Sequence, residues 1–334
     1  MALTVADKTV AGRATEGIAE HNAAVTGNQV SESNGFPWRL SFLLLGAIWG
    51  CSFWWIKLGV RAASPVDVAF ARLAGGTFAL LAVTVLTGTR LPRRASTWGH
   101  LFVLAVLFNS VPFTLFAYGE TRISAVLAGL INALTPLATL LAALTVFRQQ
   151  RPSPRLTAGL LTGLAGVLVV IGIWNGLGHG QLAGIGACLG AVCCYGTGFC
   201  YTHRHLTGPT DRPVALATGQ VICGTCQLLP VALMFGHLHK HIAGSSVLAV
   251  AALGVLGSGI AYILNFHVLN SAPPAVASSV TYLTPVFAVI VGAVFLAEPV
   301  HWYEPLGGLL ILFGAAISQH RLKRNPRQTR AGTS

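Results

Sequence analysis

The side chains best suited to binding chemistry in this sequence are polar groups inside long apolar stretches. Arg72 lies within the stretch 65–86, two turns from its start and roughly 10 Å deep if the stretch is a membrane helix. An arginine at such a depth costs about 2.5–3.5 kcal/mol unless it has a partner. Two interpretations stay open: an ion pair with Asp67 or Glu120 near the membrane surface, or attraction of an anionic group on a solute.

Two prolines, Pro136 and Pro285, lie near the middle of apolar stretches, and Leu-Thr precedes each of them. A proline inside a helix removes a hydrogen bond and frees the carbonyl four residues earlier, here at Asn132 and Thr281. Irregular backbone at membrane depth is tolerated only beside protein or a water-filled cavity. The two prolines therefore predict helix kinks, or gating positions, beside a central path.

Other polar and aromatic residues are expected near the same depth as these kinks, and each taken alone is more often a packing residue. Their common depth makes them candidates for substrate binding. The full candidate set is Trp49, Arg72, Asn109, Asn132, Ser258, Thr281 and Tyr282.

Composition indicates that long helices hold these residues in a membrane. Apolar residues make up 54% of the chain and charged residues 9%, whereas soluble proteins carry about 25% charged residues. Ten mostly apolar stretches of about 17–24 residues are each long enough to cross roughly 30 Å of hydrocarbon as a helix. They are 40–59, 65–86, 99–118, 124–147, 156–173, 182–202, 213–235, 245–268, 275–297 and 303–319.

The chain also repeats itself. Leu134-Thr135-Pro136 returns as Leu283-Thr284-Pro285, and Pro65-Val66-x-x-Ala69-x-x-Arg72 returns as Pro213-Val214-x-x-Ala217-x-x-Gln220. Offsets of about 144 to 149 positions indicate a duplicated half rather than a solenoid. Five helices per half, an odd number, would insert the second half inverted, and inverted repeats are typical of transporters.

The predicted fold is an all-α integral membrane protein of ten transmembrane helices arranged as two inverted five-helix repeats. The repeats cover residues 38–175 and 182–320. A disordered cytoplasmic tail is expected at residues 1–37, and a basic cytoplasmic tail at 321–334.

Charge predicts the orientation. Ten helices place fourteen basic residues on one side of the membrane and four on the other: Arg39, Arg90, Arg93, Arg94, Arg148, Arg151, Arg155, Arg204, Arg212, Arg321, Lys323, Arg324, Arg327 and Arg330 against Lys57, Arg61, Arg122 and Lys240. The positive-inside rule then puts both termini in the cytoplasm, and we expect the protein in the cell membrane. A net charge of +12 spread over loops and tails indicates contact with anionic lipids at the cytoplasmic face rather than binding of nucleic acid.

The cysteines and histidines predict no cofactor and no metal site. Cys223-Gly-Thr-Cys226 has the spacing of a redox motif but lies deep in an apolar stretch, where thiols act as small hydrophobic groups. His237, His239 and His241 have no carboxylate or thiol nearby in the sequence, so a solvated loop is expected.

Several segments resemble the EamA-type branch of the drug/metabolite transporter superfamily over residues 38–320. They are Gly46-Ala-Ile-Trp-Gly-Cys-Ser-Phe53, the passage from Tyr118 to Pro136, and Tyr282-Leu-Thr-Pro-Val-Phe287 through Phe295-Leu-Ala-Glu-Pro299. The resemblance implies a transporter of amino acids, other metabolites or drugs, often an exporter. The family usually has a glutamate after the fourth helix, the counterpart of Glu298, and this chain has Gln149 there.

The leading hypothesis is therefore a secondary transporter that moves a small amino acid-like or drug-like solute, as a monomer or a homodimer. One alternative is a structural or signalling membrane protein that keeps the transporter fold. The other is an intramembrane enzyme using Ser258 and His267, but nine residues on one helix separate these side chains by about 14 Å. We therefore expect no enzymatic activity.

Overall fold

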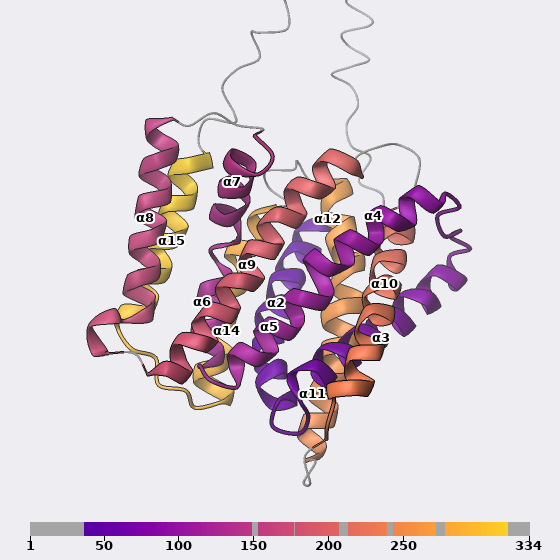
Figure 1. The fold of residues 1–334 in the computed structure, drawn as a ribbon, viewed down its shortest axis with the longest axis horizontal. Coiled ribbons are helices and arrows are strands. Elements are labelled where there is room, and N and C mark those ends of the chain that lie inside the picture. The colour runs from indigo at the N-terminus through magenta and orange to yellow at the C-terminus, as the bar shows by residue number, and fades with distance from the viewer. Residues whose placement is uncertain are drawn as a thin grey trace, which may run out of the picture. The chain divides into compact units, whose positions relative to one another are not determined.

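The computed structural model describes residues 37–148, 153–176, 178–206, 213–238, 243–271 and 278–319 (Figure 1). Within these residues the chain is helical, apart from turns, loops and one isolated β-bridge between Ala63 and Leu238. Gln149, His239, His241 and the two expected tails, apart from Pro37, lie outside the described residues.

The helices of the first half follow the predicted stretches closely. They are α2 (Trp38–Gly59), α3 (Pro65–Leu86), α4 (Ala95–Ala105), the π-helix η1 (Val106–Ser110), α5 (Val111–Glu120), α6 (Ala125–Asn132), α7 (Thr135–Thr145), α8 (Pro154–Ile171) and the short 3-10 helix η2 (Ile173–Asn175).

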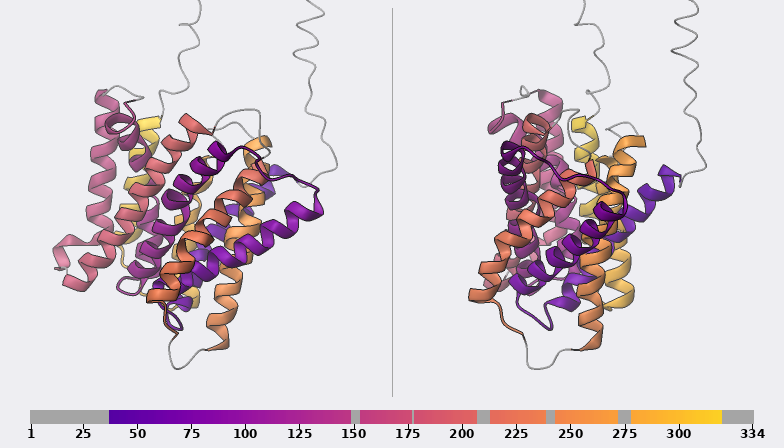
Figure 2. Two further views of the ribbon diagram at one scale, coloured as in Figure 1. Left: turned by 45° about the vertical axis from the view of Figure 1, so that its right-hand side comes forward. Right: turned by 90° about the vertical axis from the view of Figure 1, so that its right-hand side faces the viewer.

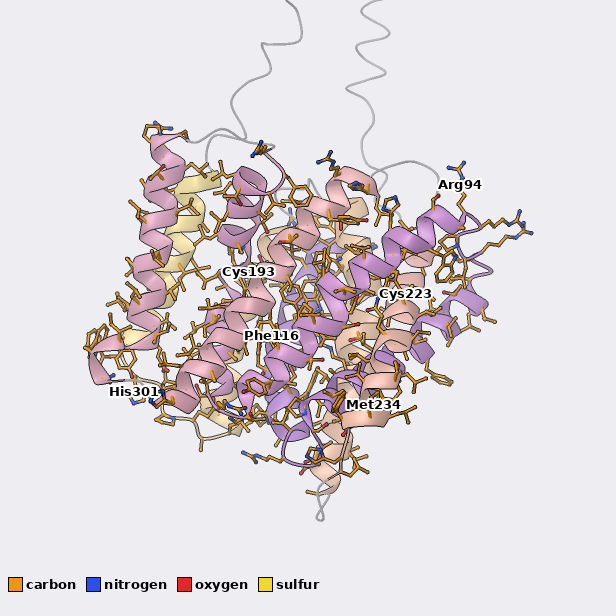
Figure 3. All side chains as sticks on the ribbon, viewed as in Figure 1. Arg94, Phe116, Cys193, Cys223, Met234 and His301 are labelled. Carbon is orange, nitrogen blue, oxygen red and sulfur yellow. The ribbon has the colours of Figure 1, made fainter. Side chains whose placement is uncertain are left out.

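The second half repeats this order. Its helices are α9 (His179–His205), α10 (Pro213–Phe235), α11 (Gly244–Gly254), the π-helix η3 (Val255–Ile260), α12 (Ala261–Ser271), the 3-10 helix η4 (Ser278–Tyr282), α14 (Thr284–Phe295) and α15 (Tyr303–Gln319). Figure 2 shows helices of both halves side by side throughout the bundle, and in Figure 3 Arg94 and Met234 lie near opposite ends of it.

Serine caps begin three helices of the first half. The hydroxyls of Ser64, Ser124 and Ser153 accept hydrogen bonds from backbone N–H groups in the first turns of α3, α6 and α8. Pro65 and Pro154 follow two of these caps, in the first turn where no backbone donor is needed. The sequence thus encodes where these helices begin.

Seven helices in the described part of the chain are long and apolar enough to cross a membrane. The bent pair α6 and α7 provides an eighth span if it is counted as one. The remaining apolar helices, Val280–Phe295 and Tyr303–Ile317, are shorter. The structure therefore confirms a multi-span helical protein and does not confirm the predicted number of ten, because the ninth predicted stretch begins outside the described residues and the tenth is short.

Equivalent helices of the two halves pack in antiparallel pairs. Thr77 on α3 contacts Thr225 on α10 through their hydroxyls at 2.8 Å, and Thr84 contacts Thr218 at 2.9 Å. Residue numbers rise along α3 as they fall along α10, so the two helices run in opposite directions. Antiparallel packing of equivalent helices is the geometry that an inverted repeat requires.

The pair α8 and α15 has the same geometry, and glycines allow its close approach (Figure 1). A Cβ atom on Gly166 would lie 2.8 Å from the carbonyl oxygen of Gly307, and one on Gly314 would lie 2.6 Å from that of Gly159. Small residues at these positions let the backbones touch, which is a common source of helix association in membranes.

Candidate functional site

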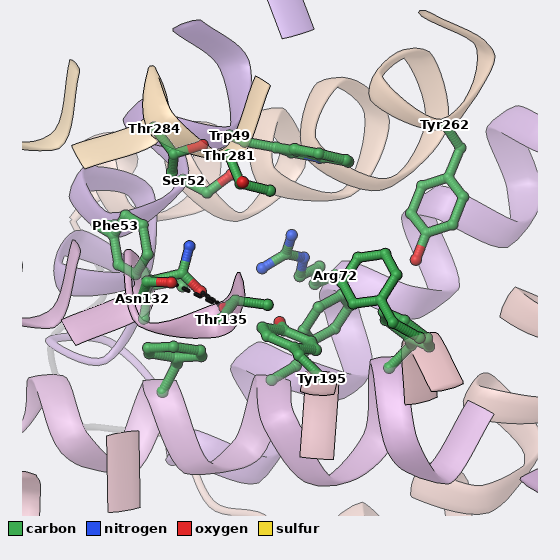
Figure 4. A pocket seen from close by; sticks show the side chains of 15 residues that line it. Trp49, Ser52, Phe53, Arg72, Asn132, Thr135, Tyr195, Tyr262, Thr281 and Thr284 are labelled. Carbon is green, nitrogen blue, oxygen red and sulfur yellow. Dashed lines mark hydrogen bonds between the residues drawn. The ribbon is translucent and has the colours of Figure 1, made fainter. Parts of the chain in front are cut away.

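A cavity of about 120 Å³ lies between helices of both halves (Figure 4). More than half of its lining residues are aromatic. The lining residues are Trp49, Ser52, Phe53, Ile56, Arg72, Phe108, Phe113, Phe116, Asn132, Thr135, Tyr195, Phe199, Tyr262, Thr281 and Thr284. Four of the predicted candidates are in this set: Trp49, Arg72, Asn132 and Thr281.

Arg72 supplies the only charged side chain that lines this cavity among the described residues. Its side chain is buried, with 7% exposed, and its Nε–H donates to the Ser258 hydroxyl at 3.0 Å. The guanidinium carbon lies 3.7 Å from the centre of the Phe113 ring, a cation–π contact. Figure 4 shows the guanidinium group pointing into the open centre of the cavity.

An ion pair of Arg72 with Asp67 or Glu120 does not occur among the described residues. Asp67 instead accepts hydrogen bonds from the Ser64 hydroxyl at 2.7 Å and the His237 backbone N–H at 2.6 Å, at the end of α3. The Glu120 carboxyl group is fully buried and has no hydrogen-bond partner in the described part of the chain. Arg72 is therefore held by a hydroxyl and a ring rather than by a carboxylate.

Asn109 and Ser258 are fully buried in the π-helices η1 and η3 and do not line the cavity. Asn109 accepts from the Gln220 amide at 2.6 Å and donates to the Tyr262 hydroxyl at 3.0 Å. These two predicted candidates thus position side chains that do reach the cavity, namely Arg72 and Tyr262. π-Helical segments are frequent at functional sites.

The two prolines mark breaks in the backbone beside the cavity. Pro136 lies in the first turn of α7, after a break that bends α6 against α7 by 40°. The Asn132 carbonyl, left without its helical partner, accepts from the Thr135 hydroxyl at 2.8 Å. Pro285 lies in the first turn of α14, after the short 3-10 helix η4.

Tyr282 is the third predicted candidate outside the cavity lining. It is partly buried and packs against the largest hydrophobic cluster, and it does not line the cavity. Trp49 does line it while packing against the cluster of Leu45, Ala261 and Val280. Both aromatic residues were predicted from their depth in the membrane, and depth does not say which face of a helix carries a side chain.

Sequence reasoning missed the aromatic wall of the cavity. Phe108 stacks on Tyr195 with ring centres 5.8 Å apart and meets Phe199 edge-on at 4.9 Å. Phe116, which Figure 3 labels in the interior of the bundle, stacks on Tyr195 at 6.0 Å. Tyr195 and Phe199 are four residues apart and share one helix face. That spacing was a detectable signal, although it is equally typical of an ordinary core.

Glu298 joins the two halves near Ser124. Its two carboxylate oxygens accept the backbone N–H groups of Ala125 and Val126, each at 3.0 Å, in the first turn of α6. A carboxylate at a helix N-terminus is stabilised by free N–H groups and by the helix dipole. Its counterpart in the first half, Gln149, lies outside the described residues.

No group of three metal-ligating side chains occurs among the described residues. Cys223 is buried beside Leu101 and Ala105, and Cys226 is exposed, with both thiols free.

Two copies of one apolar helical unit around a cavity that is mostly aromatic and contains one buried arginine define a multi-pass integral membrane protein. The chain belongs to the EamA-like transporter family, whose profile matches residues 36–172 and again 182–318. It is therefore a membrane transporter of the drug/metabolite superfamily and not an enzyme.

Curated relatives agree with this membership. Protein PecM of Dickeya dadantii is 25% identical over 274 residues, which cover 81% of this chain and 88% of that protein. An uncharacterized transporter of Archaeoglobus fulgidus is 25% identical over 84% of this chain and 96% of its own length. The uncharacterized inner membrane transporter YedA of Escherichia coli K12 is 24% identical over 81% and 86%.

A solved crystal structure shares the fold. It superposes with a TM-score of 0.61 at 19% identity and covers 86% of this chain and 99% of its own. At this identity the similarity concerns the fold alone.

Proposed function

We propose that the protein is a secondary transporter that moves a small metabolite across the cytoplasmic membrane by alternating access. The observation that carries the proposal is the cavity, because both halves line it and Arg72 is buried within it. Ten helices in two inverted repeats, with both termini in the cytoplasm, are part of the proposal. The proposal also includes repeats that cover residues 38–175 and 182–320, and contact of the protein with anionic lipid at the cytoplasmic face.

The antiparallel pairs α3 with α10 and α8 with α15 support alternating access. In an inverted repeat each half can adopt the other's conformation, and this exchange moves the opening from one side of the membrane to the other. A hydrogen bond between the Arg72 and Ser258 side chains and another between Gln220 and Asn109 cross the boundary between the halves. These cross-half contacts lie where such an exchange would act.

Export is the direction we propose, and membrane electrostatics support it for an anionic solute. A buried cation in the cavity favours a negatively charged group. A membrane potential that is negative inside drives anions outward by about 2.3 kcal/mol per charge per 100 mV. An exporter of anions needs no coupling ion under these conditions.

Excreted metabolites in cells with and without the gene test this function, together with flux in reconstituted vesicles. Thr135→Leu enlarges a side chain in the cavity wall, and Thr145→Leu makes the same change at an exposed position of the same helix. We expect flux to fall only in the first variant. No flux of any solute by correctly folded wild-type protein would favour the structural or signalling alternative.

A further inference from the structure

We propose that the solute is a planar aromatic monocarboxylate, bound with its carboxylate on Arg72 and its ring among the aromatic side chains of the cavity. This inference rests on the proposed function and specifies the substrate class of that same site.

The first argument is the set of donors that Arg72 leaves unused. A guanidinium group carries five N–H donors, and it cannot lose its charge in a protein. Only the Nε–H donates to a protein acceptor, the Ser258 hydroxyl, and neither Nη atom has an acceptor among the described residues. Because an uncompensated buried cation is costly, a negative ligand at the Nη atoms would stabilise this arrangement.

The second argument is the direction in which these donors point. Ser258 occupies the Nε edge, and Phe113 lies against one face of the guanidinium group at 3.7 Å. The end bearing the two Nη atoms is left for the ligand. Two parallel N–H groups match the two oxygens of a carboxylate. We therefore expect end-on, bidentate binding.

The third argument is the rest of the wall, in which aromatic residues are the majority. Phe108 and Phe116 each stack on Tyr195, and Trp49 also lines the cavity. Aromatic pairs gain stabilisation beyond burial through offset or edge-on contacts. The volume of about 120 Å³ is of the same order as the roughly 150 Å³ apolar cavity that takes up benzene. A single ring with a carboxylate is the size that fits.

The fourth argument concerns a second charge on the ligand. No aspartate or glutamate lines the cavity among the described residues. The Glu120 carboxyl group is fully buried and is not part of the lining. An amino acid would bring an ammonium group without a carboxylate to receive it, so a monoanion is favoured over a zwitterion. Thr284, 2% exposed and without a partner for its hydroxyl in the described chain, can bond a polar ring substituent.

Binding to the purified full-length protein in detergent, measured by calorimetry or equilibrium dialysis, tests the proposal without any mutation. The probes are benzoate, its neutral isostere benzamide, the non-aromatic cyclohexanecarboxylate, and phenylalanine. We expect benzoate to bind at least about tenfold more tightly than each of the others. Benzamide lacks the charge, cyclohexanecarboxylate lacks the aromatic ring, and phenylalanine adds an ammonium group that no carboxylate in the cavity lining receives. Equal binding of benzamide, or tighter binding of phenylalanine, would overturn the proposal.

Substitutions of Arg72 test whether this residue binds the carboxylate. Arg72→Gln should abolish the preference for benzoate over benzamide, and Arg72→Lys should weaken benzoate binding because the planar fork is lost. Arg122→Gln is the matched control, since this exposed arginine also contacts a ring, that of Tyr118 at 3.8 Å. A preference that survives Arg72→Gln, in a variant that still unfolds cooperatively, would place the anion elsewhere and overturn the assignment.

This experiment separates the two proposals. Benzoate binding by a protein that moves no solute in vesicles would support the ligand class and overturn transport. Flux of neutral or zwitterionic solutes by a protein that does not bind benzoate would leave transport standing and overturn the ligand class.

Discussion

Arg72 on α3 and Gln220 on α10 occupy equivalent positions in the two halves, and their surroundings are built alike. Arg72 donates to Ser258 in the π-helix η3, and Gln220 donates to Asn109 in the π-helix η1. Asn109 and Ser258 are themselves equivalent positions of the repeat. Each half thus sends a donor from its second helix to a π-helix of the other half.

The difference between the two copies is charge and access to the cavity. Arg72 lines the cavity, and Gln220, 8% exposed, does not. A second equivalent pair, Phe113 and Tyr262, differs in its contact, because Phe113 lies against the Arg72 guanidinium group while Tyr262 receives a hydrogen bond from Asn109. The duplicated backbone provides two matching polar layers. Arg72 and Ser258 form the charged layer, and Gln220, Asn109 and Tyr262 form the neutral layer. Only the charged layer carries a group able to attract an anion.

Replacing Asn109, the central residue of the neutral layer, should lower the free energy of unfolding more than any other substitution considered below. Asn109→Leu removes the partners of both the Gln220 amide and the Tyr262 hydroxyl. Each unsatisfied buried group costs about 1–3 kcal/mol, so the free energy of unfolding should fall by about 2–6 kcal/mol. Unfolding in mixed micelles measures this change. Asn175→Leu, at an exposed position, is the control, and an equal loss there would contradict the account.

Substitutions that add a cation to the neutral layer or remove it from the charged layer should have the next largest effect on stability. Gln220→Arg places a second cation in the bundle and should lower stability by about 2.5–3.5 kcal/mol. Arg72→Gln should raise the melting temperature of the ligand-free protein, because a glutamine there can still donate to Ser258 as Gln220 does to Asn109. Differential scanning measurements without ligand decide this. A lower melting temperature for Arg72→Gln would show that the cation is already compensated.

The comparison also explains how far sequence alone reaches. The repeat and its prolines are local patterns, so the helix order and the break before Pro136 could be predicted from them. The partner of Arg72 could not, because Ser258 lies 186 positions away on another helix. Asp67 and Glu120 were candidates because both were expected near the same membrane surface as Arg72, and a shared depth does not say which side chains pack together.

The π-helices show the same limit. Pro112 follows η1 and gives a sequence reason for irregular backbone there, but the equivalent residue after η3 is Ala261. No single residue type marks both segments. The aromatic wall was also unpredictable, since its phenylalanines and its tyrosine have the spacing of ordinary core residues, and only packing brings η1, α5 and α9 together.

Tyr262→Phe makes the two layers more alike by giving the second half the ring that Phe113 supplies in the first. It removes the acceptor for the Asn109 amide N–H, which lies 3.0 Å from the hydroxyl. One neutral hydrogen bond contributes about 0.5–1.5 kcal/mol, so unfolding in mixed micelles should show a loss in that range. Tyr118→Phe, at an exposed tyrosine, should change stability less, and the reverse order would contradict the pairing.

The smallest effect is expected where the two halves meet most symmetrically, at the hydroxyls of Thr77 and Thr225, 2.8 Å apart. A double-mutant cycle with valine should give a coupling of about 0.6 kcal/mol, typical of hydrogen bonds between membrane helices. The two threonines are still not equivalent, because one hydroxyl must donate the hydrogen bond and the other must accept it.

Thr225 donates to the Val221 carbonyl at 3.0 Å, so Thr77 is the donor within the pair. Thr225→Val therefore leaves the Thr77 hydroxyl without its acceptor, whereas Thr77→Val leaves Thr225 bonded to the backbone. The first substitution should cost more stability than the second. Equal costs would mean that the proton exchanges between the two sites, and the halves would then be equivalent at this contact.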